Sequence, residues 1–125
     1  MKAFNAIIKN YGIQVSERYY ESLELWLELE VEGGGGVCFS VWGPWNEEYK
    51  NMFAYSVKRV LDIADVDDLK NLKGAPIRAI FDGNADDPYA FVGSKIIGIK
   101  HFLKDDEFIL EEDPMYEDVK INNKL

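Results

Sequence analysis

The chain has very few of the residues that build covalent staples, metal sites and catalytic centres. Among its 125 residues there is one cysteine, Cys38, and one histidine, His101. A single cysteine excludes an intrachain disulfide and a cysteine-based metal site. With one histidine and no serine or cysteine at a diagnostic spacing, no catalytic triad is indicated. We therefore expect a protein of a reducing compartment that is not an enzyme and needs no cofactor or metal.

Positive charge is also scarce: 14 lysine and arginine residues stand against 23 aspartate and glutamate residues, a net charge of −9. Binding to DNA or RNA polymers or to anionic lipid needs clustered basic residues, so we expect none of these partners. A small anionic ligand stays open, because one arginine in a pocket can outweigh surface carboxylates that salt screens beyond ~10 Å. The simplest interpretation of the charge is that it keeps the protein in solution.

Long apolar runs are missing as well. No stretch approaches the roughly 18–20 apolar residues that a membrane helix needs, and residues 1–5 do not resemble the start of a signal peptide. We therefore expect a cytoplasmic protein. A length of 125 residues and an apolar content of 47% predict one domain, residues 1–125, that folds around a core of its own.

The clearest pattern is a strict alternation over residues 23–31. Leucine or valine occupies every odd position, and glutamate or tryptophan occupies every even one. A period of two predicts a strand with one buried face. Four glycines at 33–36 supply the positive φ values that a turn needs, and residues 37–42 then predict a second strand, so the two form a hairpin.

The elements on either side are predicted from their own patterns. Residues 3–9 predict a first strand, which a polar turn at Tyr11 and Gly12 ends. Residues 47–64 predict the main helix, because Phe53, Val57, Val60, Leu61 and Ala64 recur at spacings of three and four. A short helical turn follows, with Asp67 as its cap.

The last part of the chain predicts further strands and a tail. Residues 76–81 form a strand, residues 89–103 hold one or two more, and residues 105–125 are a partly docked acidic tail. The fold class is therefore α+β: a single domain with a largely antiparallel sheet and one main helix, in the order strand, strand, strand, helix, strand, strand.

Isolated residues with chemical potential have simpler interpretations. The acidic turn at 82–87 does not have the spacing of a calcium-binding loop, and we interpret it as a solvated turn. Cys38 lies in an apolar strand, which indicates a core thiol. Arg78 and Phe81 are three apart on one strand and so point to opposite faces. A nucleotide clamp made by those two in one subunit is disfavoured, whereas a site shared between subunits stays open.

Three stretches, taken in order, resemble a family of small bacteriophage proteins. Residues 33–42 read Gly-Gly-Gly-Gly-Val-Cys-Phe-Ser-Val-Trp and resemble its glycine-rich hairpin. Residues 57–78 resemble its helix, aspartate-led short element, Leu-Lys-Gly turn and Ile-Arg strand. Residues 97–108 resemble its closing segment. The family includes the Thoeris anti-defence proteins of the first type, and the resemblance covers residues 20–108.

The resemblance implies a function that composition alone does not. Family members are sponges: they bind the cyclic ADP-ribose signal of a bacterial immune enzyme and hold it without cleaving it, and some bind cyclic oligonucleotides. They assemble as dimers and multiples of dimers, with ligand sites between subunits. For this chain the resemblance implies a phage counter-defence protein in the host cytoplasm, a homo-oligomer that binds a small cyclic nucleotide.

Eight residues are the candidates for that ligand site, grouped by the part of a nucleotide they would contact. Cations would meet the phosphates, aromatic rings would stack on the base, and two polar side chains would contact the base edge or the ribose. The cations are Arg59, Arg78 and Lys95, the rings are Phe39, Trp42 and Phe81, and the polar side chains are Asn84 and His101.

Two other classes of function compete with this hypothesis. An acidic protein-interaction module could inhibit a host defence protein by covering a basic surface, with Trp26, Trp42 and Trp45 as anchors. The same tryptophans could instead form a homo-oligomer interface. A hydrolase of cyclic nucleotides also stays open, because His101 and the acidic turns could supply acid–base groups.

Overall fold

A computed structural model describes residues 1–16, 21–44, 47–83 and 95–116. The elements follow in chain order: β1 (Lys2–Ser16), β2 (Ser22–Val31), β3 (Gly35–Pro44), α1 (Met52–Ala64), η1 (Leu69–Asn71), β4 (Pro76–Phe81), β5 (Ile96–His101), β6 (Glu107–Ile109) and η3 (Leu110–Glu112). The α+β class with one main helix is confirmed.

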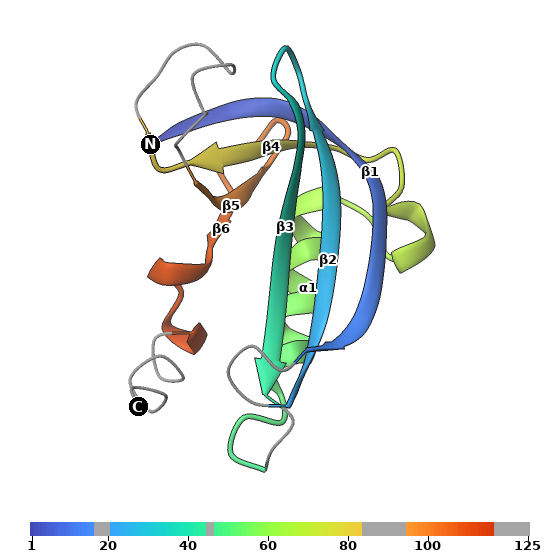
Figure 1. The fold of residues 1–125 in the computed structure, drawn as a ribbon, viewed down its shortest axis with the longest axis vertical. Helices are drawn as coiled ribbons and strands as arrows, with labels where there is room; N and C mark the ends of the chain where they lie inside the picture. The colour runs from blue at the N-terminus through green and yellow to red at the C-terminus, as the bar shows by residue number, and fades with distance from the viewer. Residues whose placement is uncertain (17–20, 45–46, 84–94, 117–125) are drawn as a thin grey trace.

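One antiparallel sheet holds all six strands of the described residues, in the order β3-β2-β1-β4-β5-β6. The long strand β1 connects the two halves of this sheet. Its residues Ala6–Ser16 pair with β2, and its residues Lys2–Ile7 pair with β4. Figure 1 shows α1 lying along β2 and β3 on one face, while β4, β5 and β6 run across the other end of the molecule.

The alternating strand predicted at residues 23–31 is confirmed, and it forms the centre of the core. Leu25, Leu27, Leu29 and Val31 of β2 are buried, as are Phe39 and Val41 on the same face of β3. Met52, Val60 and Ile63 of α1 pack over that face. The glycine turn is confirmed too, because Gly33 and Gly35 have φ values of 76° and 86°.

The turn predicted at Tyr11 and Gly12 is wrong, because β1 continues through both residues to Ser16. A bulge at Lys9 shifts the register between Ile8 and Asn10 and keeps the strand paired with β2. Gly12 has a packing role instead of a turn role. A Cβ atom at this position would lie 2.5 Å from the Trp26 indole, so the indole rests directly on the glycine backbone.

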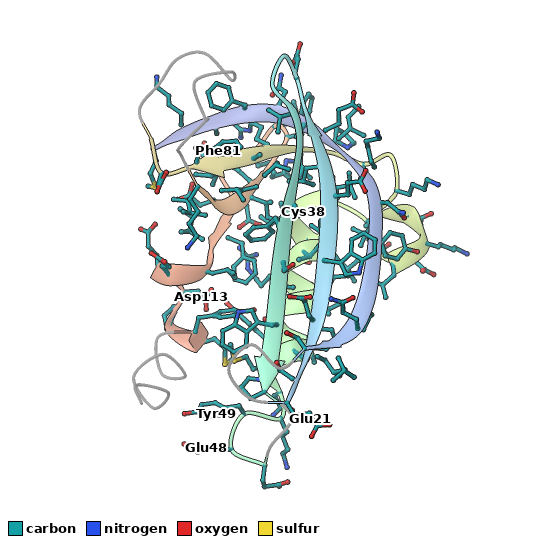
Figure 2. All side chains as sticks on the ribbon, in the orientation of Figure 1. Glu21, Cys38, Glu48, Tyr49, Phe81 and Asp113 are labelled. Carbon is teal, nitrogen blue, oxygen red and sulfur yellow. The ribbon has the colours of Figure 1, made fainter. Side chains whose placement is uncertain are left out.

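Three local predictions need smaller corrections. The main helix begins at Met52 and not at residue 47, and the short element η1 is capped by Asp68, whose carboxylate accepts the Lys70 N–H, and not by Asp67. Cys38 is exposed and not part of the core, because it lies on the face of β3 that α1 does not cover (Figure 2).

The C-terminal segment contributes a strand that the sequence pattern did not reveal. β6 is only three residues long, and it pairs with β5 through Phe108 opposite Ile99. Phe108 and Tyr116 are buried. The Tyr116 hydroxyl lies 2.6 Å from Ser56 Oγ on α1, donates to the Trp42 carbonyl and accepts from the Trp42 N–H. Residues 117–125 lie outside the described part.

The buried Tyr116 hydroxyl gives a prediction for alkaline pH. Burial raises the pKa of Tyr116 to about 12, from an ordinary value of 10.0. A group with a raised folded pKa contributes fully below its unfolded pKa and loses that contribution as pH rises through the folded value. We expect wild type to lose about 2–3 kcal/mol of unfolding free energy between pH 10 and pH 12, beyond the loss in Tyr116→Phe. Urea denaturation of both proteins across this range measures the difference, and parallel curves would contradict the prediction.

No helix in the described part of the chain is long and apolar enough to span a membrane.

Candidate functional site

Two of the three candidate stacking rings lie in the core. Phe39 on β3 is 5% exposed, and Phe81 on β4 is 2% exposed. Phe81 packs against Phe4 with 6.0 Å between ring centroids, at the sheet end near the N-terminus (Figure 2). Burial of this degree leaves neither ring a face that a base could stack on, and core packing accounts for both positions.

The other predicted residues are scattered. Trp42 is partly exposed on the outer face of β3, and its ring meets Tyr116 edge-on with 5.4 Å between centroids. The Lys95 side chain is mostly exposed, with its Nζ 3.9 Å from a Glu111 carboxylate oxygen. Asn84 lies outside the described residues.

The remaining three residues come from three different elements and meet at one turn. Arg59 lies on α1, Arg78 on β4 and His101 at the end of β5. All three bind the backbone or side chains of the segment that joins β5 to β6, residues 102–106, which we call the β5–β6 turn. The structure therefore brings together three of the eight predicted residues.

Arg78 holds the turn through two backbone carbonyls. Its Nε donates to the His101 carbonyl at 2.9 Å, and its Nη2 donates to the Lys104 carbonyl at 2.7 Å. A planar guanidinium suits this task because its donors are fixed in a fork. A guanidinium carries five N–H donors, so these two bonds leave others for a ligand.

The side chain of His101 binds two backbone N–H groups of the turn. Its ring is buried, and its Nδ1 accepts from the backbone N–H groups of Leu103 and Lys104, both at 3.0 Å. Since Nδ1 accepts two hydrogen bonds, the ring proton is on Nε2, which lies 3.4 Å from Asp65 Oδ2. The imidazole thus replaces a backbone carbonyl as acceptor for the turn.

Arg59 anchors the far end of the turn to α1. Its Nη2 donates to Asp106 Oδ1 and to the Glu107 carbonyl, each at 2.9 Å, and its guanidinium lies 5.5 Å from the Phe108 ring centroid. The hydrogen bond from Arg59 lowers the pKa of Asp106, and the same bond raises the pKa of Arg59. This ion pair is therefore fully formed at neutral pH and weakens in acid.

The turn presents two apolar side chains to solvent. Phe102 is 37% exposed and Leu103 is 83% exposed. Sequence reasoning missed Phe102 as a candidate ring and favoured Phe81 instead. The available signal was its position near the end of the strands predicted at residues 89–103, just before Lys104, Asp105 and Asp106. An exposed aromatic with cations beside it is the usual arrangement for gripping a nucleotide.

Two cations lie on one face of the sheet beside this turn. Lys100 is opposite Arg78 in the β4–β5 pair, so the two side chains share a face of the sheet. Lys100 Nζ lies 3.6 Å from Asp105, whereas Lys104 has no ion-pair partner among the described residues. Lys104 is therefore the side chain at this turn that is most available to a phosphate.

One other part of the described surface suits an anion poorly. A depression of about 150 Å³ near the end of β6 is lined by Glu107, Ile109, Glu112, Asp113 and Pro114, so its acidic wall would repel a phosphate. Across the described ranges, no group of three or more histidine, cysteine, aspartate or glutamate side chains is arranged to hold a metal ion.

Replacing Arg78 with lysine tests the role of the fork. A lysine cannot reach both carbonyls, so we expect a loss of about 1–3 kcal/mol of unfolding free energy. Amide hydrogen exchange should also become faster at Leu103 and Lys104, whose N–H groups depend on the same turn geometry. Unchanged exchange at these two amides would show that Arg78 does not hold the turn.

Comparison of the chain with protein-family models, with curated proteins and with solved structures gives no match.

Proposed function

We propose that this chain is a non-enzymatic binding protein that sequesters a small cyclic nucleotide, such as a cyclic ADP-ribose isomer, at the β5–β6 turn. The observation that carries the proposal is the exposed ring of Phe102 in a turn that is flanked by Arg78, Lys100 and Lys104. The resemblance of residues 20–108 to the Thoeris anti-defence proteins supports the ligand class, and it gives the protein a phage counter-defence role.

The chemistry of the turn fits a nucleotide in two ways. Stacking a base on an exposed aromatic is worth about 1–3 kcal/mol and tolerates any base. Lys104 and the remaining Arg78 donors can meet the phosphates by charge-assisted hydrogen bonds. The turn is held in place by Arg78, His101 and Arg59 before any ligand arrives, which reduces the ordering cost of binding.

The site at one turn is open, so a second wall is needed to enclose a ligand. Phe102 offers one ring, whereas the two phenylalanines predicted from sequence, Phe39 and Phe81, are buried. A second copy of the chain would supply that wall, in keeping with the subunit-shared sites that the resemblance implies. In this proposal the protein holds its ligand by burial between copies and does not cleave it.

Two adjacent substitutions test the site. We expect Phe102→Ala to weaken binding of a cyclic ADP-ribose isomer by roughly 5- to 150-fold, the loss of one stacked base. Leu103→Ala is the matched control, since Leu103 is more exposed but has no aromatic face. Isothermal titration calorimetry measures both affinities. Equal affinity of Phe102→Ala and wild type would place the site elsewhere.

A protein-interaction module is the second candidate, and the exposure of Leu103 favours it. A rigid turn with an aromatic and an aliphatic tip resembles the anchors that enter apolar pockets of partner proteins. In that case Phe102→Ala and Leu103→Ala would both weaken capture of a host protein, and no nucleotide would be retained. The same pair of variants therefore separates the two functions.

A further inference from the structure

The second half of β1 is a sheet edge that the described chain leaves open. β4 pairs with β1 only as far as Ile7, and the sheet then continues on that side through Gly74 and Ala75 opposite Ile8. Beyond this point β1 runs on to Ser16, and no described strand lies on its outer side. Figure 1 shows this half of β1 curving along the outside of the sheet, next to β2.

The backbone direction along this edge follows from the hydrogen bonds at its start. The Ile8 N–H donates to the Ala75 carbonyl at 3.0 Å, and the Ile8 carbonyl accepts from the Gly74 N–H at 2.7 Å. The backbone N–H and C=O groups of Ile8 therefore point away from β2. Peptide groups alternate along a paired strand, and the bulge at Lys9 adds one residue. Tyr11, Ile13 and Val15 therefore direct their peptide groups outward.

Tyr11 confirms this direction, since its N–H is capped by the side chain of Asn10 at 3.0 Å and not by β2. The peptide groups of Ile13 and Val15 then form the open part of the edge. Their side chains lie on the α1 face of the sheet opposite Leu25 and Leu23, yet Ile13 is 48% exposed and Val15 is 63% exposed.

The sequence of this edge lacks the charges and prolines that commonly protect edges in monomers, although a bulge at Lys9 precedes it. Residues 10–16 read Asn-Tyr-Gly-Ile-Gln-Val-Ser, with no charged residue and no proline. Natural edge strands are normally blocked by lysine, proline or inward charges. The chain has a net charge of −9, so two copies repel each other through their acidic surfaces. An edge without acidic residues is a place where two copies can approach with less repulsion.

We infer that the edge formed by residues 12–16 of β1 pairs antiparallel with the same edge of a second copy, around a two-fold axis near Gln14. In this register Ile13 of each chain is opposite Val15 of the other. The N–H and C=O groups of Ile13 and Val15 in the two strands then form about four interchain hydrogen bonds. The two six-stranded sheets become one continuous sheet, and Ile13 and Val15 extend its apolar face across the axis.

This inference does not rest on the proposed nucleotide function, and it is tested without ligand. Sedimentation equilibrium of wild type should give an even multiple of the 14.3 kDa chain mass. We expect Val15→Lys to weaken association by about tenfold or more. Ile7→Lys is the matched control: Ile7 is 50% exposed on the same strand, but it is paired on both sides.

A second variant acts on the backbone alone. Ile13→Pro removes an outward N–H and leaves the bonds to β2 intact, so it should also release single chains while the far-UV circular dichroism stays that of wild type. Single chains in wild type at every concentration would overturn the inference. Unchanged association of folded Val15→Lys and Ile13→Pro would also overturn it, because the interface would then lie elsewhere.

Discussion

Phe108→Ala is expected to lower the free energy of unfolding by about 3–5 kcal/mol, the cost of emptying a buried aromatic site. Phe108 is the most deeply buried residue of β6, at 1% exposure. Its ring packs edge-on against Tyr55, with 6.3 Å between centroids, and lies 6.0 Å from the Tyr116 ring. The Arg59 guanidinium also rests on it. Removing the ring therefore weakens both the core and the anchor of the β5–β6 turn.

The same substitution at Phe102 provides the comparison. Phe102 is six residues away and substantially exposed, so its loss should change unfolding free energy by less than about 1 kcal/mol. Guanidinium titrations of the two variants give both values. Similar stability of Phe108→Ala and Phe102→Ala would mean that β6 and the C-terminal segment do not dock as described.

Gly98→Ala is the second substitution with a large expected effect. A Cβ atom at Gly98 would lie 2.5 Å from the carbonyl oxygen of Phe108 and 3.0 Å from the Cα of Ile109, both backbone atoms of β6. Backbone cannot move aside as a flexible side chain can, so β6 must shift away from β5. We expect a loss of about 1–3 kcal/mol or more. Faster hydrogen exchange is expected at His101, whose N–H donates to Asp106.

Gly36→Ala is the control for this prediction. Gly36 also lies in a strand, but the nearest atom to an added Cβ would be the Leu29 carbonyl oxygen at 3.9 Å, an ordinary contact. Its stability should stay within about 0.5 kcal/mol of wild type. Equal stability of the two alanine variants would show that β5 and β6 are not packed as closely as described.

The parts of the fold that followed from sequence are those where a periodic pattern coincides with burial. The alternation in β2 predicted a buried face, and Leu25, Leu27, Leu29 and Val31 are buried there under α1 and neighbouring side chains. It fails at the start of the strand, where Leu23 is only partly buried and Glu24 on the other face is buried. The strand at Pro76–Phe81 was predicted with its observed bounds. Its limits are set by Pro76 and by the acidic turn that begins at Asp82, and both are local signals.

The missed features depend on contacts between distant residues. β6 has three residues, too few to show a period, and it exists because Phe108 fits between α1 and β5. Gly12 was predicted as a turn residue because glycine commonly ends strands. Its role is to leave room for the indole of Trp26, fourteen positions later, and this contact has no local sequence signal. The start of α1 at Met52 was also missed, since its N-cap residue, Asn51, makes no side-chain capping hydrogen bond.

In the candidate site, too, some residues were predicted from sequence while their contacts were not. Arg59, Arg78 and His101 were chosen for their chemistry, and the structure places all three at one turn. Their partners are backbone carbonyls, N–H groups and Asp106, which no sequence pattern reveals. Phe81 and Phe102 have the same side chain, but Phe102 is 37% exposed and Phe81 only 2%, and sequence alone does not give this difference.

Native mass spectrometry of the purified protein, with a panel of cyclic ADP-ribose isomers and cyclic di- and trinucleotides, tests the proposed function most directly. It reports the mass of the assembly and of any bound ligand in one spectrum. We predict a multimer that retains one of these ligands, and recovery of that ligand intact after the protein is denatured. No retention across the panel would contradict nucleotide sequestration, and recovery of a cleaved ligand would show a hydrolase.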